Sequence, residues 1–386
     1  MAFELVERPI PGAAAFRDKT DAGLLSQAGV LLCVGARMRR TEATLPEECS
    51  ALDVPPVAAN LEAGETFVDP AVVRTTMNRQ LGERNFSVDV STPVRPEVSA
   101  EIFEAIAQSP TDQIWAAGLL ESSLRHPTEV VRVAAAAAYH PFTTEKERIL
   151  RILVQGTYSD EALVRTLAAT ALAQARPDHG RLDELTSRAR AAGTGGPSHT
   201  TLLVHGTFAR QQVWWQPGGD FHAYLTTLLP SLTRTPSWSA PYAAADRFEW
   251  TGGYSDAARS DAAQQLAMWV AEHQAEELDI IAHSYGGEVA MLATTLGLNM
   301  GELILLSCPA IPGKYFPDFT RVRGPIVSFR VRLDLILLAD SYISGADPQF
   351  RDPRIQEHIL PLWFDHGATH DPRVWRNTKY NIPQSI

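Results

Sequence analysis

A serine follows directly on a short apolar run in the segment LDIIAHSYGG, residues 278–287. Ala282 stands two positions before Ser284, and Gly286 stands two positions after it. A sharp turn from a strand into a helix favours small residues at those two positions, because larger side chains would collide across the turn. Such a turn strains the serine backbone and exposes its hydroxyl. The pattern predicts a nucleophile, and the alternative is a serine that only caps a helix.

Two backbone N–H groups near this serine could stabilise the negative charge that forms when a carbonyl group is attacked. One belongs to Tyr285, at the start of the helix expected after the serine, where the helix field favours negative charge. The other is expected from the loop VHGTF, residues 204–208, with Thr207 as the donor and Phe208 as the alternative. His205 in this loop is interpreted as a structural histidine that braces the loop.

Short apolar runs alternate with helix-like stretches in the second half of the chain. This alternation is typical of a parallel sheet with helices on both faces. Strands are expected over residues 201–204, 247–250, 278–282, 303–307, 326–331 and 358–363, and helices over residues 256–275 and 287–298. Ligands of such sheets bind outside the carboxyl ends of the strands. Ser284 is expected at that edge.

These features make the chain, from around residue 198 to its end, resemble the α/β-hydrolase family in its lipase and esterase branch. The resemblance rests on VHGTF, on DIIAHSYGG, and on an acid and a histidine that follow in the family's order. The stretches WWQPGGDF and WTGGYSDAARSDAA also look like those of small lipases or esterases. Two features depart from the family's pattern. Ala282 replaces the family's first glycine, and no room remains after the expected linker for the family's first two strands. The resemblance implies a serine esterase that needs no metal or organic cofactor.

The family's order is serine, then acid, then histidine, with the acid after a late strand. Asp334 follows the strand expected over residues 326–331 directly, and its carboxylate would fix the tautomer of the catalytic histidine. Asp340 is the alternative acid, and Asp347 is a more distant one. An aspartate that leaves a strand is otherwise commonly a helix cap or a turn former.

Two histidines, His366 and His370, follow the last expected strand. Asp371 and Pro372 are typical of the start of a helix, and the family's base usually precedes that helix by several residues. This favours His366 as the base, while His370 could brace the loop or contact the substrate. The implied mechanism is attack by Ser284 on a carbonyl carbon, followed by hydrolysis of the acyl-enzyme.

Residues 98–192 are rich in alanine, leucine and arginine, which predicts helices. Residues 129–138 (EVVRVAAAAA) align with residues 162–171 (ALVRTLAATA). Arg132 and Arg165 are therefore 33 positions apart (165 minus 132). Copies at a fixed spacing resemble HEAT-like repeats, in which alanine lets stacked helices approach closely. The alternative is an ordinary alanine-rich helical bundle.

The full prediction for the fold is an α/β-hydrolase domain over residues 201–386, preceded by an all-α region. Residues 193–200, which include three glycines and a proline, are expected to be a linker. Residues 1–97 contain recurrent prolines and short periodic stretches, so an irregular region is expected, with one helix over residues 70–82.

The formal net charge of −11 and the pI of about 5.5 argue against nucleic acid or an anionic membrane as the main partner. The three cysteines have neither a disulfide framework nor metal-ligand spacing. With no expected signal peptide or membrane-spanning segment, a cytoplasmic protein is expected. Its expected partners are a small-molecule or lipid ester and a protein bound through the helical region. The rival hypothesis is a helical-repeat interaction protein whose hydrolase domain is a scaffold or acts on a thioester, amide or phospholipid.

Overall fold

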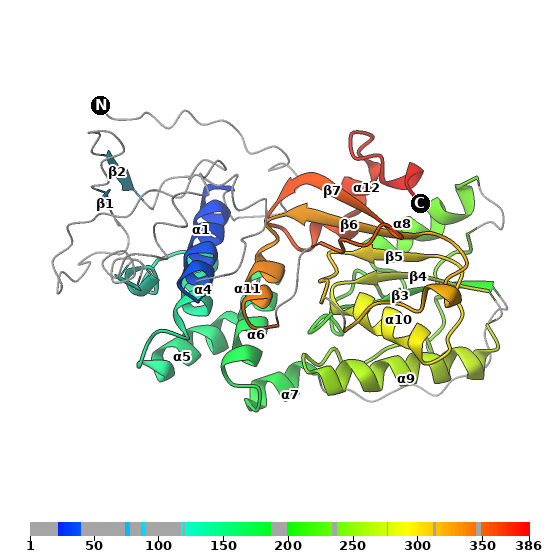
Figure 1. Ribbon diagram of the computed structural model, residues 1–386, viewed down its shortest axis with the longest axis horizontal. Helices are drawn as coiled ribbons and strands as arrows, with labels where there is room; N and C mark the ends of the chain where they lie inside the picture. Colours follow the sequence, from blue (N-terminus) through cyan, green and yellow to red (C-terminus); the bar gives the residue numbers. More distant parts are fainter. Residues whose placement is uncertain are drawn as a thin grey trace. The chain divides into compact units, whose positions relative to one another are not determined.

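A computed structural model describes residues 22–39, 74–77, 86–89, 117–118, 120–186, 199–233, 238–275, 277–311, 314–344 and 349–386 (Figure 1). The chain divides into two compact units. The first unit comprises Met1–Pro177, Arg332–Ile343 and Leu362–Asp365, and the second comprises Asp178–Val331, Ser344–Pro361 and His366–Ile386. Most of the predicted linker (residues 193–198) and the third candidate acid, Asp347, lie outside the described residues.

A sheet of five strands gives the chain its α/β class, as predicted. The strands lie in chain order: β3 (His199–Val204), β4 (Glu277–His283), β5 (Leu303–Leu306), β6 (Ile326–Arg332) and β7 (Ile355–Trp363). The pairs β3 with β4, β4 with β5, and β5 with β6 are parallel, with Ile280 opposite Leu303 and Leu303 opposite Ile326. Parallel strands buried on both faces read as continuous apolar runs, which is why these segments could be recognised.

The strand predicted over residues 247–250 is wrong, because this segment is not part of any strand. The preceding segment pairs with β3 through an isolated bridge between Thr201 and Pro241. A proline has no N–H to continue a ladder of hydrogen bonds. Trp250 is buried for another reason, since its indole Nε1 donates to the carbonyl of His205 at 2.8 Å.

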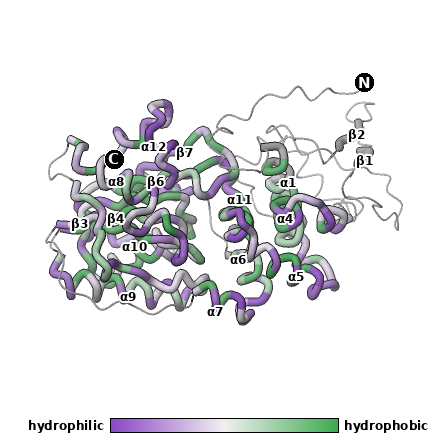
Figure 2. Tube along the Cα trace, turned by 180° about the vertical axis from the view of Figure 1, so that it is seen from behind, coloured by the Kyte–Doolittle hydropathy of each residue, from purple (hydrophilic) through white to green (hydrophobic). Residues whose placement is uncertain are grey.

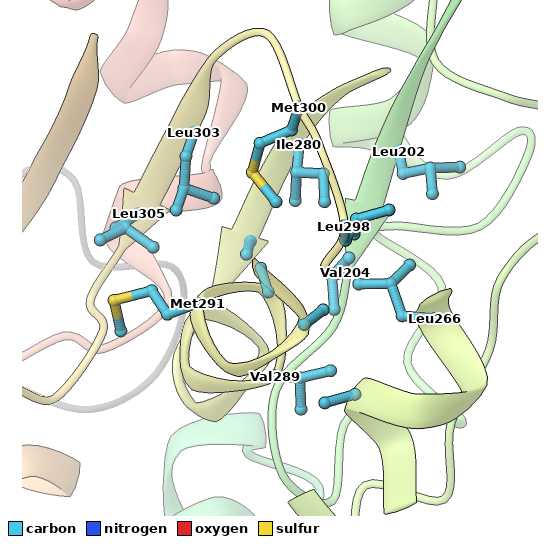
Figure 3. Close-up of a cluster of buried hydrophobic side chains, with 14 of the residues drawn as sticks. Leu202, Val204, Leu266, Ile280, Val289, Met291, Leu298, Met300, Leu303 and Leu305 are labelled. Atoms are coloured by element: carbon cyan, nitrogen blue, oxygen red, sulfur yellow. The ribbon is translucent and has the colours of Figure 1, made fainter. Parts of the chain in front are cut away.

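Helices cover both faces of this sheet within the second unit. On one face, α9 (Asp256–His273) and α10 (Tyr285–Thr295) pack on β3, β4 and β5 through a buried apolar cluster that includes Leu202, Ile280 and Val289 (Figure 3). On the other face, the ring of Phe329 in β6 lies 6.3 Å from that of Trp375 in α12 (Pro372–Arg376). The remaining helices here are α7 (Gly180–Thr186) and α8 (Asp220–Leu228), with 3-10 turns at Leu229–Ser231, Phe319–Arg321, Ala368–His370 and Ile382–Gln384.

The first unit contains α1 (Ala22–Arg39), α4 (Glu129–Tyr139), α5 (Lys146–Gly156), α6 (Ala162–Ala175) and most of α11 (Leu335–Ser344). Hydrophobic and hydrophilic residues alternate along α5 (Figure 2), and its buried residues are Ile149, Leu150, Leu153 and Gly156. Helical structure over residues 129–175 therefore agrees with the sequence, while a separate HEAT-like domain remains a prediction. Among the described residues, no helix combines the length and the apolarity needed to cross a membrane.

Two expectations for residues 1–97 are wrong. The helix α1 lies in the region expected to be irregular, and β1 (Arg74–Met77) pairs antiparallel with β2 (Phe86–Asp89) where a helix was expected. Helix α1 is stabilised by packing, since a Cβ added to Gly35 would lie 2.6 Å from the Cβ of Ala138 in α4. A close helix contact of this kind depends on a partner about 100 residues away, which local periodicity does not reveal.

The two aligned copies are structurally equivalent at the start of their helices. The Nη1 of Arg132 in α4 donates to the carbonyl of His126 at 2.6 Å. The Nη1 of Arg165 in α6 donates to the carbonyl of Ser159, also at 2.6 Å. In each copy the arginine therefore reaches back six residues and holds the turn that precedes its own helix.

The turns themselves also match. The residues before α4 and α6 are Thr128 and Glu161, and both are extended, with φ/ψ of −83°/128° and −85°/121°. Their N–H groups donate to the side chain two residues earlier, to His126 Nδ1 at 3.1 Å and to Ser159 Oγ at 3.2 Å. The hydroxyl of Ser159 also donates to Glu129 at 2.6 Å, which links the two copies.

The arginine contact predicts a measurable loss of stability. Arg165→Ala removes a charged hydrogen bond to a turn carbonyl and should lower the free energy of unfolding by ~1–2 kcal/mol. Arg176→Ala is the matched control, because Arg176 forms an exposed ion pair with Glu147 and a surface pair contributes little. Urea unfolding of both variants measures the difference. Equal effects of the two substitutions would contradict the proposed role of Arg165.

Candidate active site

Ser284 has a backbone conformation that few residues other than glycine adopt, with φ 54° and ψ −135°. It stands at the N-cap position of α10, yet its side chain makes no capping hydrogen bond. Its N–H donates to the carbonyl of Leu306 at 2.8 Å, and its carbonyl accepts from the N–H of Gly287 at 2.9 Å. These contacts fix the turn, and they exclude the alternative in which the hydroxyl serves to cap the helix.

The small residues around Ser284 are required by packing on the neighbouring strands. A Cβ added to Gly286 would lie 2.5 Å from the carbonyl oxygen of His205 and 2.6 Å from that of Val204. A Cβ added to Gly287 would lie 2.4 Å from the sulfur of Cys308. The sequence argument was right that this turn needs small residues. The obstacles that the added atoms would meet lie at the end of β3 and just beyond β5.

The loop after β3 approaches the serine directly. A Cβ added to Gly206 would lie 2.6 Å from the Cβ of Ser284 and 3.3 Å from its Oγ. Phe208, with φ 55°, donates its N–H to the carbonyl of Gly252 at 3.0 Å. Because that N–H is already engaged, the geometry favours Thr207 over Phe208 as the second donor to an oxyanion.

His205 has the surroundings of a structural histidine. Its ring is fully buried between Trp215, at 4.6 Å between ring centroids, and Trp250, at 5.7 Å. Its Nδ1 lies 2.8 Å from the carbonyl of Gly206 and must carry the proton, because a carbonyl only accepts. Burial lowers the pKa of His205 from 6.5 to about 4. The ring is therefore neutral at physiological pH.

Both candidate bases contact His283, the residue immediately before Ser284. The ring centroids of His366 and His370 lie 4.6 Å and 4.5 Å from that of His283. The Nε2 of His283 lies 3.1 Å from the carbonyl of His366, to which it donates. Burial, and then the neighbouring imidazoles of His370 and His366, hold the pKa of His283 well below 6.5. A neutral His283 thus ties the end of β4 to the loop that carries both bases.

The two histidines differ in their contacts. The ring of His370 stacks on Trp214 at 4.0 Å and meets Phe221 edge-on at 6.2 Å. This packing is compatible with a bracing role for His370, one of the two roles that the sequence left open beside that of the base. His366 is buried, and its backbone is held by His283. The helix start predicted at Asp371 is confirmed, since its side chain accepts from the N–H of Arg373 and Pro372 is the first helical residue.

Asp334 is buried within the first unit, two residues after the end of β6. Its Oδ1 accepts from the N–H groups of Ile336 and Leu337 at 3.0 Å and 3.2 Å, which begins α11. It therefore does act as a cap, and these two bonds use one of its carboxylate oxygens. The alternative acid, Asp340, is buried inside α11. The carboxylate of Asp334 is held in the turn after β6 by backbone N–H groups. Asp340 lies about one and a half helical turns further along, within α11.

Backbone strain gathers at the carboxyl edge of the sheet. Seven described residues other than glycine have positive φ, and five of them follow strand ends: Phe208, Ser284, Ser307, Leu333 and Phe364. Each strained residue costs of order 1–3 kcal/mol, and such residues cluster at functional sites. Ser284, Ser307, Leu333 and Phe364 each follow the last residue of their strand. Ligands of parallel sheets bind at the ends of strands where these residues lie.

An ion pair that sequence reasoning missed supports the start of α10. The Nε of Arg259 in α9 lies 3.0 Å from the Oε2 of Glu288, and both side chains are buried. The guanidinium also lies over the ring of Tyr285, 4.2 Å from its centroid. Tyr285 is the first residue of α10, where helix N–H groups have no acceptor within the helix. The ion pair therefore packs against Tyr285, whose backbone N–H is the predicted oxyanion donor.

The comparisons with known proteins identify no family. No family model matches the chain, and no curated protein matches it. The crystal structure of an uncharacterized protein from Bacillus cereus ATCC 10987 is 12% identical, with a TM-score of 0.23. The match covers 70% of this chain and 93% of that one, and at this TM-score it carries no argument about fold or function. Among the described residues, no three or more His, Cys, Asp or Glu side chains are grouped to hold a metal ion.

The packing of Gly286 gives a first prediction for the site. Gly286→Ala should lower the free energy of unfolding by roughly 1–3 kcal/mol, because the methyl group would meet two backbone oxygens that cannot move aside. Gly180→Ala is the control, since nothing lies within 4 Å of a Cβ added there, and its effect should stay within ~0.5 kcal/mol. Thermal and urea unfolding measure both. A neutral Gly286→Ala would contradict the close contact between α10 and β3.

The pKa of His205 predicts how stability depends on pH. The unfolded chain protonates this histidine below pH 6.5, whereas the folded chain resists protonation down to about pH 4. Acidification from pH 6.5 to 4 should therefore remove about 3 kcal/mol of stability through His205. Urea unfolding across this range measures the slope. His205→Gln should reduce the slope of unfolding free energy against pH by the contribution of one proton. An unchanged slope would show that His205 is not buried in a neutral form.

Proposed function

We propose that this protein is a serine hydrolase that cleaves a carboxylic ester through an acyl-enzyme intermediate. The observation that carries the proposal is the conformation of Ser284, a buried serine with φ 54° at a strand end whose hydroxyl does not cap the following helix. A strained turn of this kind is maintained only where the surrounding structure enforces it. The glycine loop beside its Oγ supports the proposal further.

In the proposed mechanism His366 removes the proton from the hydroxyl of Ser284, whose oxygen attacks the carbonyl carbon of the ester. The backbone N–H groups of Thr207 and Tyr285 stabilise the oxyanion. The protonated histidine then gives its proton to the departing alcohol, which leaves the acyl group on the serine. A water molecule, deprotonated by the same histidine, releases the acid and restores the hydroxyl.

Asp334 is the proposed acid that orients the histidine and stabilises its protonated form. Asp334 is favoured over Asp340 because it lies in the turn after β6. There its carboxylate accepts hydrogen bonds from two backbone N–H groups of α11. His366 is favoured over His370 because the ring of His370 already packs on Trp214 and Phe221. The proposal needs no metal or organic cofactor, and its substrate is a small-molecule or lipid ester.

A second candidate function rests on the equivalent turns at Arg132 and Arg165. Repeated helices of this kind form extended surfaces that bind other proteins. The chain would then be an interaction protein whose hydrolase-like part is a scaffold or acts on a thioester, amide or phospholipid. Absence of any reaction at Ser284, together with a stable fold, would favour the scaffold.

The nucleophile can be tested by covalent labelling. A fluorophosphonate probe should label the wild type at Ser284, and p-nitrophenyl esters of short acids should be hydrolysed. Ser284→Ala should abolish both. Ser307→Ala is a matched control, because Ser307 is also buried, strained and at a strand end, but its hydroxyl is paired with that of Thr369 at 3.1 Å. Labelling that survives Ser284→Ala would remove the basis of the proposal.

The acid and the base can be separated by paired substitutions. Asp334→Asn should lower kcat by ~10⁴-fold, as expected for a wrong histidine tautomer, while asparagine still caps α11. Asp340→Asn should retain most activity. His366→Ala should abolish turnover and His370→Ala should retain it. If His370→Ala loses activity by several orders of magnitude while His366→Ala stays near wild type, His370 is the base.

A further inference from the structure

Helix α1 lies against residues near the proposed acid and base, although its Gly29 is more than 300 positions away from them along the chain. A Cβ added to Gly29 would lie 3.0 Å and 3.3 Å from two ring carbons of Phe364, and 3.6 Å from a methyl group of Leu335. All three residues belong to the first unit and are buried. The missing side chain of Gly29 therefore allows the backbone of α1 to rest directly on both residues.

The two residues that α1 touches are also tied to each other. The N–H of Leu335 donates to the carbonyl of Phe364 at 3.1 Å, and the N–H of Phe364 donates to the carbonyl of Arg332 at 2.9 Å. Leu335 follows Asp334 directly, and Phe364 precedes His366 by two residues. The turn that carries the acid and the turn that leads to the base are therefore joined by two backbone hydrogen bonds.

Both turns contain a buried residue in a strained conformation. Leu333 has φ 45° and Phe364 has φ 70°. Neither residue is a glycine, so these conformations persist only if the surrounding packing enforces them. Helix α1 supplies that packing at Phe364. A second contact holds α11 from the helical repeat, since the Nε2 of Gln174 in α6 donates to the carbonyl of Ala339 at 3.1 Å.

We infer that α1 is a positioning element of the proposed active site and that Gly29 is its key residue. By packing against Phe364 and Leu335, it holds the turn that carries Asp334 and the turn that leads to His366. This inference rests on the proposed function and gives the N-terminal region a role in it. The contact of Gly35 with Ala138 joins α1 to α4, and it involves neither Phe364 nor Leu335.

Gly29→Val tests the inference, because its side chain should separate α1 from Phe364 and Leu335. We expect kcat for a p-nitrophenyl ester to fall at least tenfold, with KM within twofold of the wild type. The acidic limb of the kcat/KM profile should move to lower pH, because a displaced carboxylate stabilises the protonated histidine less. Gly29→Ala, which adds a single methyl group, should give a smaller effect of the same kind if the valine variant is poorly folded.

Two comparisons separate positioning from general damage. Gly35→Ala disturbs only the contact of α1 with α4, so it should lower the melting temperature while kcat stays within twofold. Phe364→Leu combined with Gly29→Val restores space at the contact and should recover part of the lost kcat. Equal losses of kcat in the Gly29 and Gly35 variants, or no recovery in the double variant, would overturn the inference.

Hydrogen exchange gives a readout that does not depend on activity. Amides of residues 333–337 and 364–370 should exchange faster in Gly29→Val than in the wild type, and they should not change in Gly35→Ala. Unchanged exchange in Gly29→Val would overturn the inference even if the enzyme is active. An inactive wild type that still shows this exchange pattern would instead contradict the proposed function and leave the positioning contact intact.

Discussion

The turn at Ser284 is the constraint on which the rest of the second unit depends. A serine at φ 54° is unfavourable by of order 1–3 kcal/mol, so its surroundings must compensate. They do so by close approach, with the backbone of Gly206 against the serine and the backbone of Gly286 against the carbonyls that end β3. Strand β4 lies between β3 and β5 in the sheet, so residues that follow both neighbouring strands can pack against the turn at Ser284. A single larger side chain at either glycine would open it.

Polar contacts extend this rigidity away from the serine. On one side the buried pair of Arg259 and Glu288 supports the first turn of α10. On the other side His283 reaches the backbone of His366, and burial keeps its ring uncharged. A charged His283 would repel the protonated form of the proposed base, so a neutral imidazole is compatible with the proposed mechanism. His283, beside the proposed nucleophile, therefore anchors the loop that carries His366 and remains uncharged.

Local patterns predicted the parts of the structure that local physics decides. The small residues around Ser284, the helix after it and the start of α12 at Asp371 were all readable from spacing alone. Tertiary packing decided the rest. The segment 247–250 does not join the sheet although Trp250 is buried, and contacts with α4 stabilise α1. The only sequence signal for His283 was a histidine beside the serine, and the strain at Phe364 had none, because it arises from the partners of that residue.

A crystal structure of the protein after reaction with diethyl p-nitrophenyl phosphate would test the proposed active site most directly. This reagent phosphorylates a serine only when a base and oxyanion donors surround it. The proposed function predicts a phosphoryl group on the Oγ of Ser284, with its unesterified oxygen within hydrogen-bond distance of the N–H groups of Thr207 and Tyr285. An unmodified Ser284, or an adduct oxygen that points away from both N–H groups, would contradict it.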